Sequence, residues 1–224
     1  PVTTMPFGQS RTTFHEYTGN PEIGPGTPIR DATRAKILRA VKSKKQLEQV
    51  LVDFWYNHFN VDAIIEEARW GFVTLERDAI RPHVLGRFRD LLQAASLHPA
   101  MLFYLDNYLN TVPRRVGNRV TGGINENQGR ELLELHTVGV DAGYSQADVY
   151  EASRCLTGHG IDNLNTSGAY VFRAANHDNE AKQVFGLSVP AGGGEGDVQR
   201  LFDHLASHPA TARYISKRLC QRFV

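Results

Sequence analysis

The segment NENQGRELLELHTVG, residues 125–139, places charged side chains and a histidine among leucines. If the segment is helical, each residue advances about 100° around the axis, which fixes the direction of every side chain. Arg130 and Glu134 then fall in the one sector without leucines, where residues four apart form a solvent-exposed ion pair. Glu131 and His136 fall among the apolar residues, and we expect both to point inward.

An inward carboxyl group such as Glu131 is suited to general acid–base chemistry. Burial of an unpaired carboxylate is costly, so Glu131 must meet a hydrogen-bond donor or keep its proton. His58 continues an apolar helical stripe in residues 43–60, SKKQLEQVLVDFWYNHFN, and is also expected to point inward. We therefore predict that His58, Glu131 and His136 converge closely enough to share hydrogen bonds, a water or an ion. The simpler alternative is that both histidines are hydrogen-bonded core residues.

The spacing of these residues does not indicate a metal. Helical ligand pairs are usually three or four residues apart, whereas Glu131 and His136 are five apart and Glu134 and His136 are two apart. The sequence also has no glycine-rich phosphate loop, no Gly-x-Ser-x-Gly elbow and no Cys-x-x-Cys pair. At this stage both the presence of a metal and the identity of any cofactor are unknown.

Two polar segments offer further candidate groups. LTGHGIDN (156–163) places His159 between two glycines, and ANHDNEAK (175–182) gathers polar residues that include His177 and Asp178. Such segments are either solvated turns or loops that carry function, and the sequence leaves both interpretations open.

The composition narrows the class of protein. The chain has 25 basic and 24 acidic residues, a net charge of +1, so its overall charge does not argue for nucleic acid or an anionic membrane as a partner. No apolar run approaches the roughly 18 residues of a membrane-spanning helix. The two cysteines, Cys155 and Cys220, are too few for a disulfide framework. We expect two buried free thiols, and the alternative is a single bridge between them.

The apolar periodicity predicts a mainly α-helical protein, an irregular array of helices with one small β/loop excursion around residues 159–195. Residues 1–30 are expected to form an extended proline-rich arm, and residues 31–224 a single helical domain. The one good strand candidate is GAYVFR (168–173), and the basic stretch 111–123 is expected to be a loop. Helices are predicted at 31–41, 43–59, 74–80 and 82–92, from Pro99, across the opening segment, at 145–156, before 208 and from Pro209.

Several helix ends have residue patterns with a physical reason. Ser43 with Gln46 and Ser145 with Asp148 have the spacing of capping boxes. His-Pro-Ala occurs twice, at His98 and His208, and proline favours the first position of a helix. We expect both of these histidines to sit at the corner before a helix.

Five blocks of sequence follow one another along the chain. They are FWYNHFNV (54–61), RPHVLGRFRDLL (81–92), HPAMLFYLDN (98–107), residues 125–160 and HDNEAKQVFG (177–186). Together they resemble, in the same order, a large bacterial family catalogued as domain of unknown function 1800. Two positions depart from it: His159 stands where the family usually has an aromatic residue, and Gly129 where it commonly has alanine.

The resemblance indicates which polar positions recur in the family, and we divide eleven of them into two groups by the role that the enzyme hypothesis would give them. The five expected to be catalytic are Glu131, His136, His58, Arg130 and Glu134. The six expected to bind substrate are Asp106, Asn107, Asn125, Asn127, His177 and Asp178. The resemblance also implies an exported (periplasmic or extracellular) bacterial protein, because family members are generally exported. An exported sulfatase-like protein is an expected partner, since genes for such proteins often lie nearby.

Two hypotheses for the function follow. The first is an enzyme, a hydrolase or lyase acting on a saccharide-like or other extracellular substrate, with Glu131 as general acid or base and the histidines as its partners. The second is a non-catalytic binding or assembly module, in which the same Glu, His and Arg side chains form a structural network. A cleft that opens onto the polar groups would favour the first, and groups sealed from solvent would favour the second.

The last segment, PATARYISKRLCQRFV (209–224), predicts a helix with apolar positions as far as its final turn. Leu219 and Phe223 lie on this face, and no glycine or polar stop follows them. Family members are also typically longer. We therefore expect a partner chain, or a missing C-terminal half of the domain, to cover the Leu219/Phe223 face.

Overall fold

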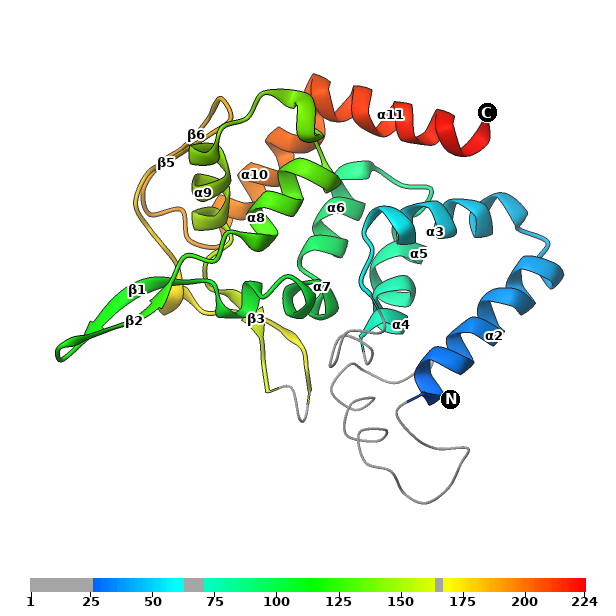
Figure 1. Ribbon diagram of the computed structural model, residues 1–224, viewed down its shortest axis with the longest axis horizontal. Coiled ribbons are helices and arrows are strands. Elements are labelled where there is room, and N and C mark those ends of the chain that lie inside the picture. Colours follow the sequence, from blue (N-terminus) through cyan, green and yellow to red (C-terminus); the bar gives the residue numbers. More distant parts are fainter. Residues whose placement is uncertain (1–25, 63–70, 164–166) are drawn as a thin grey trace, which may run out of the picture. The chain divides into compact units, whose positions relative to one another are not determined.

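The structure, a computed structural model, describes residues 26–62, 71–163 and 167–224 (Figure 1). The chain divides into two compact units. Unit 1 comprises residues 1–104, of which residues 1–25 and 63–70 lie outside the description, together with residues 161–170. Unit 2 comprises Leu105–Gly160 and Val171–Val224. Residues 1–25, which make up most of the predicted proline-rich arm (1–30), lie outside the described residues.

Unit 1 is built from helices that bury one apolar face each. In chain order they are α2 (Thr27–Lys42), α3 (Gln46–His58), α4 (Phe72–Thr74), the π-helix η3 (Leu75–Ile80), α5 (Arg81–His83), α6 (Phe88–Ser96) and α7 (Pro99–Tyr104). α3 ends within one residue of the predicted end and begins three residues after the predicted start at Ser43, and its stripe buries Val52, Phe54 and Trp55. The predicted capping box at Ser43 is wrong, because the Gln46 side chain donates to the Ser43 carbonyl oxygen at 2.7 Å instead.

The helix before Pro82 does not break where the sequence predicts. Proline lacks an N–H and its ring collides with the carbonyl four residues back, so a break was expected there. Instead the chain widens into η3, in which the Arg81 N–H donates to the Glu76 carbonyl, five residues back. The π-helix η3 continues directly into α5, which contains Pro82, and α6 begins at Phe88.

Unit 2 combines helices with short antiparallel strand pairs. Its elements are η4 (Asn107–Leu109), β1 (Thr111–Val116), β2 (Arg119–Gly123), α8 (Asn127–Glu131), η5 (Leu132–His136), η6 (Val140–Ala142), α9 (Gln146–Cys155), η7 (Ala174–Asn176), β5 (Lys182–Val184), β6 (Leu187–Val189), α10 (Gly196–Ser207) and α11 (Pro209–Phe223). A further strand pair, β3 (His159–Ile161) and β4 (Tyr170–Phe172), continues into the part of the chain that belongs to unit 1. The mainly α-helical class is confirmed.

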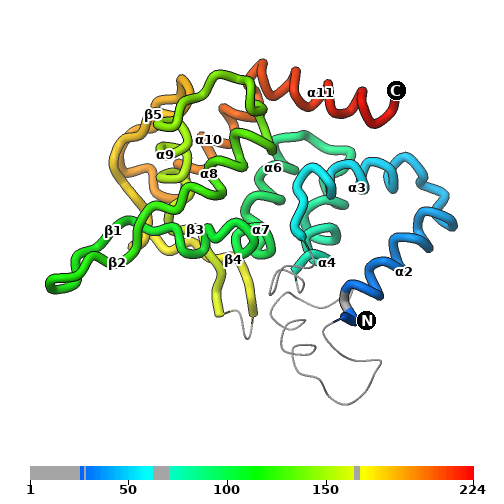
Figure 2. Tube along the Cα trace, viewed as in Figure 1, coloured from blue at the N-terminus to red at the C-terminus, as the bar shows by residue number. Residues whose placement is uncertain are grey.

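The strands correct one prediction and confirm another. The predicted strand near Tyr170 exists as β4, but residues 111–123 are a β-hairpin and not a loop. In Figure 2 this hairpin extends away from α8 and α9 of its own unit. β1 and β2 are paired from Thr111 to Gly123, with an irregularity between Thr111 and Arg114 that accommodates Pro113.

Helices α8 and α9 pack closely because Gly129 faces Ser153. A Cβ at Gly129 would overlap the Ser153 Oγ, which donates to the Val149 carbonyl oxygen at 2.8 Å. The start of α9 is fixed by the predicted capping box, in which Ser145 N donates to Asp148 Oδ2 at 2.7 Å and Asp148 N to Ser145 Oγ at 3.2 Å. These contacts fix α8, which carries Arg130 and Glu131, against α9.

Both His-Pro-Ala corners are confirmed. The Nδ1 atoms of His98 and His208 each accept from the backbone N–H two residues later, at 3.1 Å in both cases. Burial lowers the pKa of His98 to about 4, so this histidine stays neutral.

At the other end of α11, Phe223 is 50% exposed, and the partner expected to cover it stays a prediction. No helix within the described ranges is long and apolar enough to cross a bilayer.

Candidate functional site

The opening segment folds as α8 followed directly by the π-helical turn η5. A π-turn holds an extra residue, so side chains beyond Leu132 are rotated relative to a regular helix. Leu135 was predicted in the apolar sector and is 44% exposed, whereas His136 is buried as predicted. Gly139 ends the turn with a φ of 87°, and its N–H donates to the Leu133 carbonyl oxygen at 3.1 Å.

Four half-buried side chains, Arg130, Glu131, Glu134 and Tyr144, form what we call the α8 cluster. Burial raises the pKa of Glu131, the neighbouring Glu134 raises it further, and Arg130 opposes both. Burial also raises the pKa of Tyr144, with further contributions from Glu134, to which the phenol donates a hydrogen bond, and from Glu131. The cluster thus places two carboxyl groups, a guanidinium and a phenol within electrostatic reach of one another.

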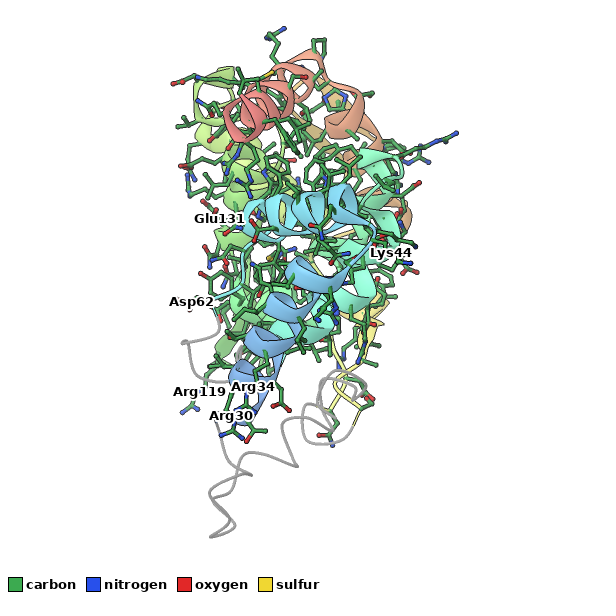
Figure 3. The ribbon with its side chains drawn as sticks, turned by 90° about the vertical axis from the view of Figure 1, so that its right-hand side faces the viewer. Arg30, Arg34, Lys44, Asp62, Arg119 and Glu131 are labelled. Carbon is green, nitrogen blue, oxygen red and sulfur yellow. The ribbon has the colours of Figure 1, made fainter. Side chains whose placement is uncertain are left out.

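Arg130 has a different ion-pair partner from the one predicted. Its Nη2 lies 3.1 Å from Glu126 Oε2 and 2.9 Å from Gln146 Oε1, and Gln146 itself donates to Glu126 at 2.5 Å. Because the Arg130 guanidinium pairs with Glu126, Glu134 accepts a hydrogen bond from Tyr144 instead. Figure 3 labels Glu131, whose side chain lies at the surface of its unit.

The histidines predicted to partner Glu131 are both buried, but they belong to different units. His136 ends η5 in unit 2, and His58 ends α3 in unit 1. The His58 ring lies among aromatic side chains, with ring centroids 4.7 Å from Phe59 and 5.5 Å from Trp55. The convergence of His58 with Glu131 and His136 stays a prediction.

The predicted substrate-binding asparagines divide into buried and exposed ones. Asn107 is buried, and its amide donates to the carbonyl oxygens of Leu156 at 3.0 Å and His159 at 2.9 Å. Asn110, which the sequence did not single out, donates to Asn107 Oδ1 at 3.1 Å and accepts from the Asn125 N–H at 3.0 Å. These bonds tie together the backbone at the ends of α9 and β2.

The remaining three polar positions of this group lie at or near the surface. Asn125 is half-buried, and its Oδ1 accepts from the Asn127 N–H at 3.0 Å, which shapes the turn into α8. Asn127 and Asp106 are exposed. Asp106 adopts a left-handed conformation, with a φ of 57°, at the start of η4. Their part in substrate binding stays a prediction.

A second group of ionisable residues is sealed inside unit 2. We call His177, Lys182 and Asp197 the Asp197 cluster. Asp197 Oδ2 lies 2.7 Å from Lys182 Nζ and 3.1 Å from His177 Nε2, and all three side chains are fully buried. Lys182 Nζ also donates to the carbonyl oxygens of Asp178 at 2.6 Å and Glu180 at 2.9 Å. None of the three side chains has solvent-exposed surface.

The other oxygen of Asp197 explains a glycine in the loop before α10. A Cβ at Gly193 would overlap Asp197 Oδ1, which has no hydrogen-bond partner among the described residues. On the other side, His177 Nδ1 lies 2.8 Å from the Thr157 carbonyl oxygen, so that nitrogen carries a proton. Burial, reinforced by the nearby His177, lowers the pKa of His159 to about 3.

Asp178 joins this buried group to α9. Arg154 donates from Nε and Nη2 to the two Asp178 carboxylate oxygens, at 2.8 and 3.0 Å, and from Nη1 to Glu151. Burial raises the pKa of Asp178, but the hydrogen bonds from Arg154 and from the Glu180 N–H outweigh it and hold the pKa below its usual range. Asp178 is thus committed to a bidentate ion pair.

Comparison with known proteins identifies the family. Residues 17–224 match the family described as protein of unknown function, DUF1800. The chain belongs to the DUF1800 family. No curated protein and no solved structure matches it. The family description assigns no activity, so the residues of this DUF1800 chain must supply the argument for one.

A metal site and a cavity in unit 1 are the other candidate places for a function. Within residues 26–62, 71–163 and 167–224, no three His, Cys, Asp or Glu side chains are placed to hold a metal. A cavity of about 170 Å³ lies among α2, α3 and η3 of this DUF1800 chain. Its charged lining is already paired, since Arg39 and Arg81 both contact Glu76, at 3.3 and 2.7 Å.

Sequence reasoning missed Lys182 and Asp197 for a physical reason. A lysine and an aspartate fifteen residues apart, in a loop and beside a glycine run, look like solvated surface residues. A weak signal for Asp197 was present, because an acid in the first turn of a helix is often fixed by local donors. Cys155 is a free, buried thiol as predicted, whereas Cys220 is free but exposed.

Proposed function

We propose that this DUF1800 protein is an enzyme, a hydrolase or lyase that uses the α8 cluster for general acid–base chemistry on a saccharide-like extracellular substrate. One observation carries the proposal: Glu131 is partly buried with a raised pKa, yet remains accessible beside a second carboxyl group. Pairs of carboxyl groups in unequal environments are the usual means of dividing acid and base roles near neutral pH. The extracellular setting of the substrate rests on the family resemblance.

Each member of the α8 cluster has a chemical role in this proposal. Glu131, which holds its proton more tightly than an ordinary glutamate, donates it to a leaving oxygen or removes one from the substrate. Glu134 provides negative charge and orients the Tyr144 phenol. Arg130, fixed by Glu126, positions an anionic or hydroxyl group of the substrate.

The alternative is a non-catalytic binding or assembly module. It is favoured by the Asp197 cluster and by the Asn107–Asn110 pair, because both are sealed from solvent and bonded to backbone. Such networks specify how elements pack and have no contact with a substrate. The two proposals therefore differ only in what the α8 cluster does.

The deciding experiment replaces Glu131 by Gln in the full chain. Wild-type protein is first screened against extracellular polysaccharides for release of reducing or unsaturated ends. Glu131→Gln keeps the shape and most hydrogen bonds but cannot transfer a proton, so turnover should fall by about 10²–10⁴-fold while the thermal midpoint stays near wild type. Glu180→Gln, an exposed glutamate of the same unit, is the matched control and should keep full activity.

A folded Glu131→Gln variant with wild-type turnover would remove Glu131 from catalysis. If activity is lost only in proportion to folded protein, the binding or assembly proposal is favoured. The proposals that the protein is exported, with an exported sulfatase-like protein as partner, rest on the family resemblance. They are tested by fractionation of cells carrying the full-length gene and by co-purification of the two tagged proteins.

A further inference from the structure

The β1–β2 hairpin concentrates positive charge at the surface of unit 2. It carries three exposed arginines, Arg114, Arg115 and Arg119, and residues 111–123 contain no acidic residue. In the part of the chain that the structure describes, none of these three arginines forms an ion pair. Arg119 extends away from the ribbon in Figure 3. Charge that the protein itself leaves uncompensated is available to an anionic partner.

The tip of the hairpin is also apolar. Val116 and Val120 are 64% and 68% exposed, on either side of the turn at Gly117 and Asn118. Gly117 has a φ of 60°, as expected for glycine at the first central position of a two-residue hairpin turn. The turn therefore has a defined conformation. The residues of β1 and β2 that flank it are exposed, and so are the two valines.

The strand register distributes these side chains over both faces. Arg115 pairs with Val120 and Val116 pairs with Arg119, and residues paired across two strands point to the same face. One face of the hairpin therefore presents Arg115 with Val120, and the other presents Arg114 and Arg119 with Val116. A linear polyanion lying along the hairpin would contact the arginines of one face and leave a valine exposed on the other.

We propose that the β1–β2 tip inserts shallowly into a bilayer that contains anionic lipid. A bilayer surrounds an inserted tip, so both valines reach the acyl boundary while all three arginines lie at the level of the lipid phosphates. Guanidinium groups match phosphate oxygens in charge and geometry. This surface role is independent of the enzyme proposal, and it needs no membrane-spanning helix.

The net charge of the rest of the chain would confine membrane binding to the hairpin. The whole chain has 25 basic and 24 acidic residues, three of the basic ones on this hairpin, so the remainder is net acidic by two. A basic residue near an anionic surface strengthens binding by about fivefold. Loss of all three arginines should therefore weaken membrane binding by about a hundredfold. Added salt should also weaken the membrane binding of the wild-type protein, because it screens the same charges.

The test is co-flotation of the full chain with lipid vesicles. Vesicles of phosphatidylcholine alone are compared with vesicles in which a third of the lipid is phosphatidylserine, at about 0.02 M and about 0.15 M salt. We expect binding to the anionic vesicles only, weaker at the higher salt. Arg114→Gln/Arg115→Gln/Arg119→Gln should weaken binding by about a hundredfold, and Val116→Ser/Val120→Ser should weaken it without changing net charge.

The matched control is Arg200→Gln/Arg213→Gln/Lys217→Gln, which removes the same charge from exposed positions on α10 and α11. It should bind the anionic vesicles nearly as well as wild type, and circular dichroism checks that each variant is folded. Equal loss in control and hairpin variants would overturn the proposal, because binding would then follow net charge alone. Binding to soluble heparin but not to vesicles would overturn it in favour of a linear polyanion.

Insertion is tested by one further variant. Val116→Trp places an indole at the tip, and its fluorescence should shift to the blue on anionic vesicles in difference spectra against wild type, whose own two tryptophans are the background. No shift on vesicles that do bind the protein would contradict insertion.

Discussion

Asp197 and Glu131 are carboxyl groups of the same unit, but only Glu131 is within reach of water. Asp197 is fully buried, and a lysine and a histidine meet one of its oxygens. Glu131 lies half-buried beside another acid, with one arginine nearby that is already paired to Glu126. The first carboxyl group is neutralised by its surroundings, and the second is not.

The difference follows from the cost of desolvating charge. A buried carboxylate is tolerated only when donors and positive charge replace its water, and the group is then fixed in one geometry. A carboxyl group at the surface can keep an unfavourable neighbour, because solvent screens part of the repulsion. Side chains of one chemical type therefore hold unit 2 together in one place and remain available for reaction in another.

The largest expected effect comes from breaking the sealed cluster. Lys182→Met removes the cation but not the volume, and leaves the fully buried Asp197 carboxyl group without its lysine partner. We expect the free energy of unfolding to fall by about 3–5 kcal/mol, measured by urea denaturation. The double variant Lys182→Met/Asp197→Leu should recover much of this loss, because no buried charge remains unpaired. A loss below about 1 kcal/mol in the single variant would mean that water enters the cluster.

A smaller effect concerns pH and His159, which lies beside His177 with ring centroids 6.4 Å apart. Its folded-state pKa of about 3 is below the value of 6.5 for a free histidine, so the unfolded chain binds this proton more readily. The corresponding stability is complete above pH 6.5 and is lost as the pH falls towards 3. Between pH 7 and pH 5 the loss is about 2 kcal/mol for a group this buried.

His159→Phe keeps a ring beside Phe172, whose centroid lies 4.8 Å away, and removes the titrating group. The difference between the free energies of unfolding at pH 7 and pH 5 should then be about 2 kcal/mol smaller than in wild type. His98 contributes a loss of the same sign, so a pH dependence should remain. An unchanged difference would show that His159 is not kept neutral by the sealed region.

The two regions also differ in how far the sequence could predict them. The capping box at Ser145, both His-Pro-Ala corners and the burial of His136 follow from local patterns, and the structure confirms them. The π-turn η5 does not follow, because a regular helical period placed Leu135 inside. The Lys182–Asp197 pair could not be predicted either, since its residues meet only after the loop and α10 have packed together.

The basic β1–β2 hairpin could not be predicted from the sequence either. Residues 111–123 contain valines in no clear alternation, and Pro113 and three glycines argue against a strand. What forms β1–β2 is the turn at Gly117 together with the pairing of Val116 to Arg119, which are contacts between strands. A net charge of +1 conceals the hairpin as well, because charge summed over a chain carries no information on where it gathers.

The smallest expected effect, and the sharpest test of the contrast, is the stability of Glu131→Gln. A raised folded-state pKa means that the folded protein binds this proton more readily than the unfolded chain, so the protonated carboxyl group contributes stability at low pH that is lost as the pH rises. At neutral pH the charged group contributes nothing favourable, and the neutral amide removes its repulsion from Glu134. The free energy of unfolding should therefore change by less than about 0.5 kcal/mol, with any change towards higher stability. Thermal and urea unfolding at neutral pH measure it, with Lys182→Met as the reference for a destabilising change in the same unit. A loss above about 2 kcal/mol would place Glu131 in a structural network like that of Asp197, and the distinction between the two regions would no longer hold.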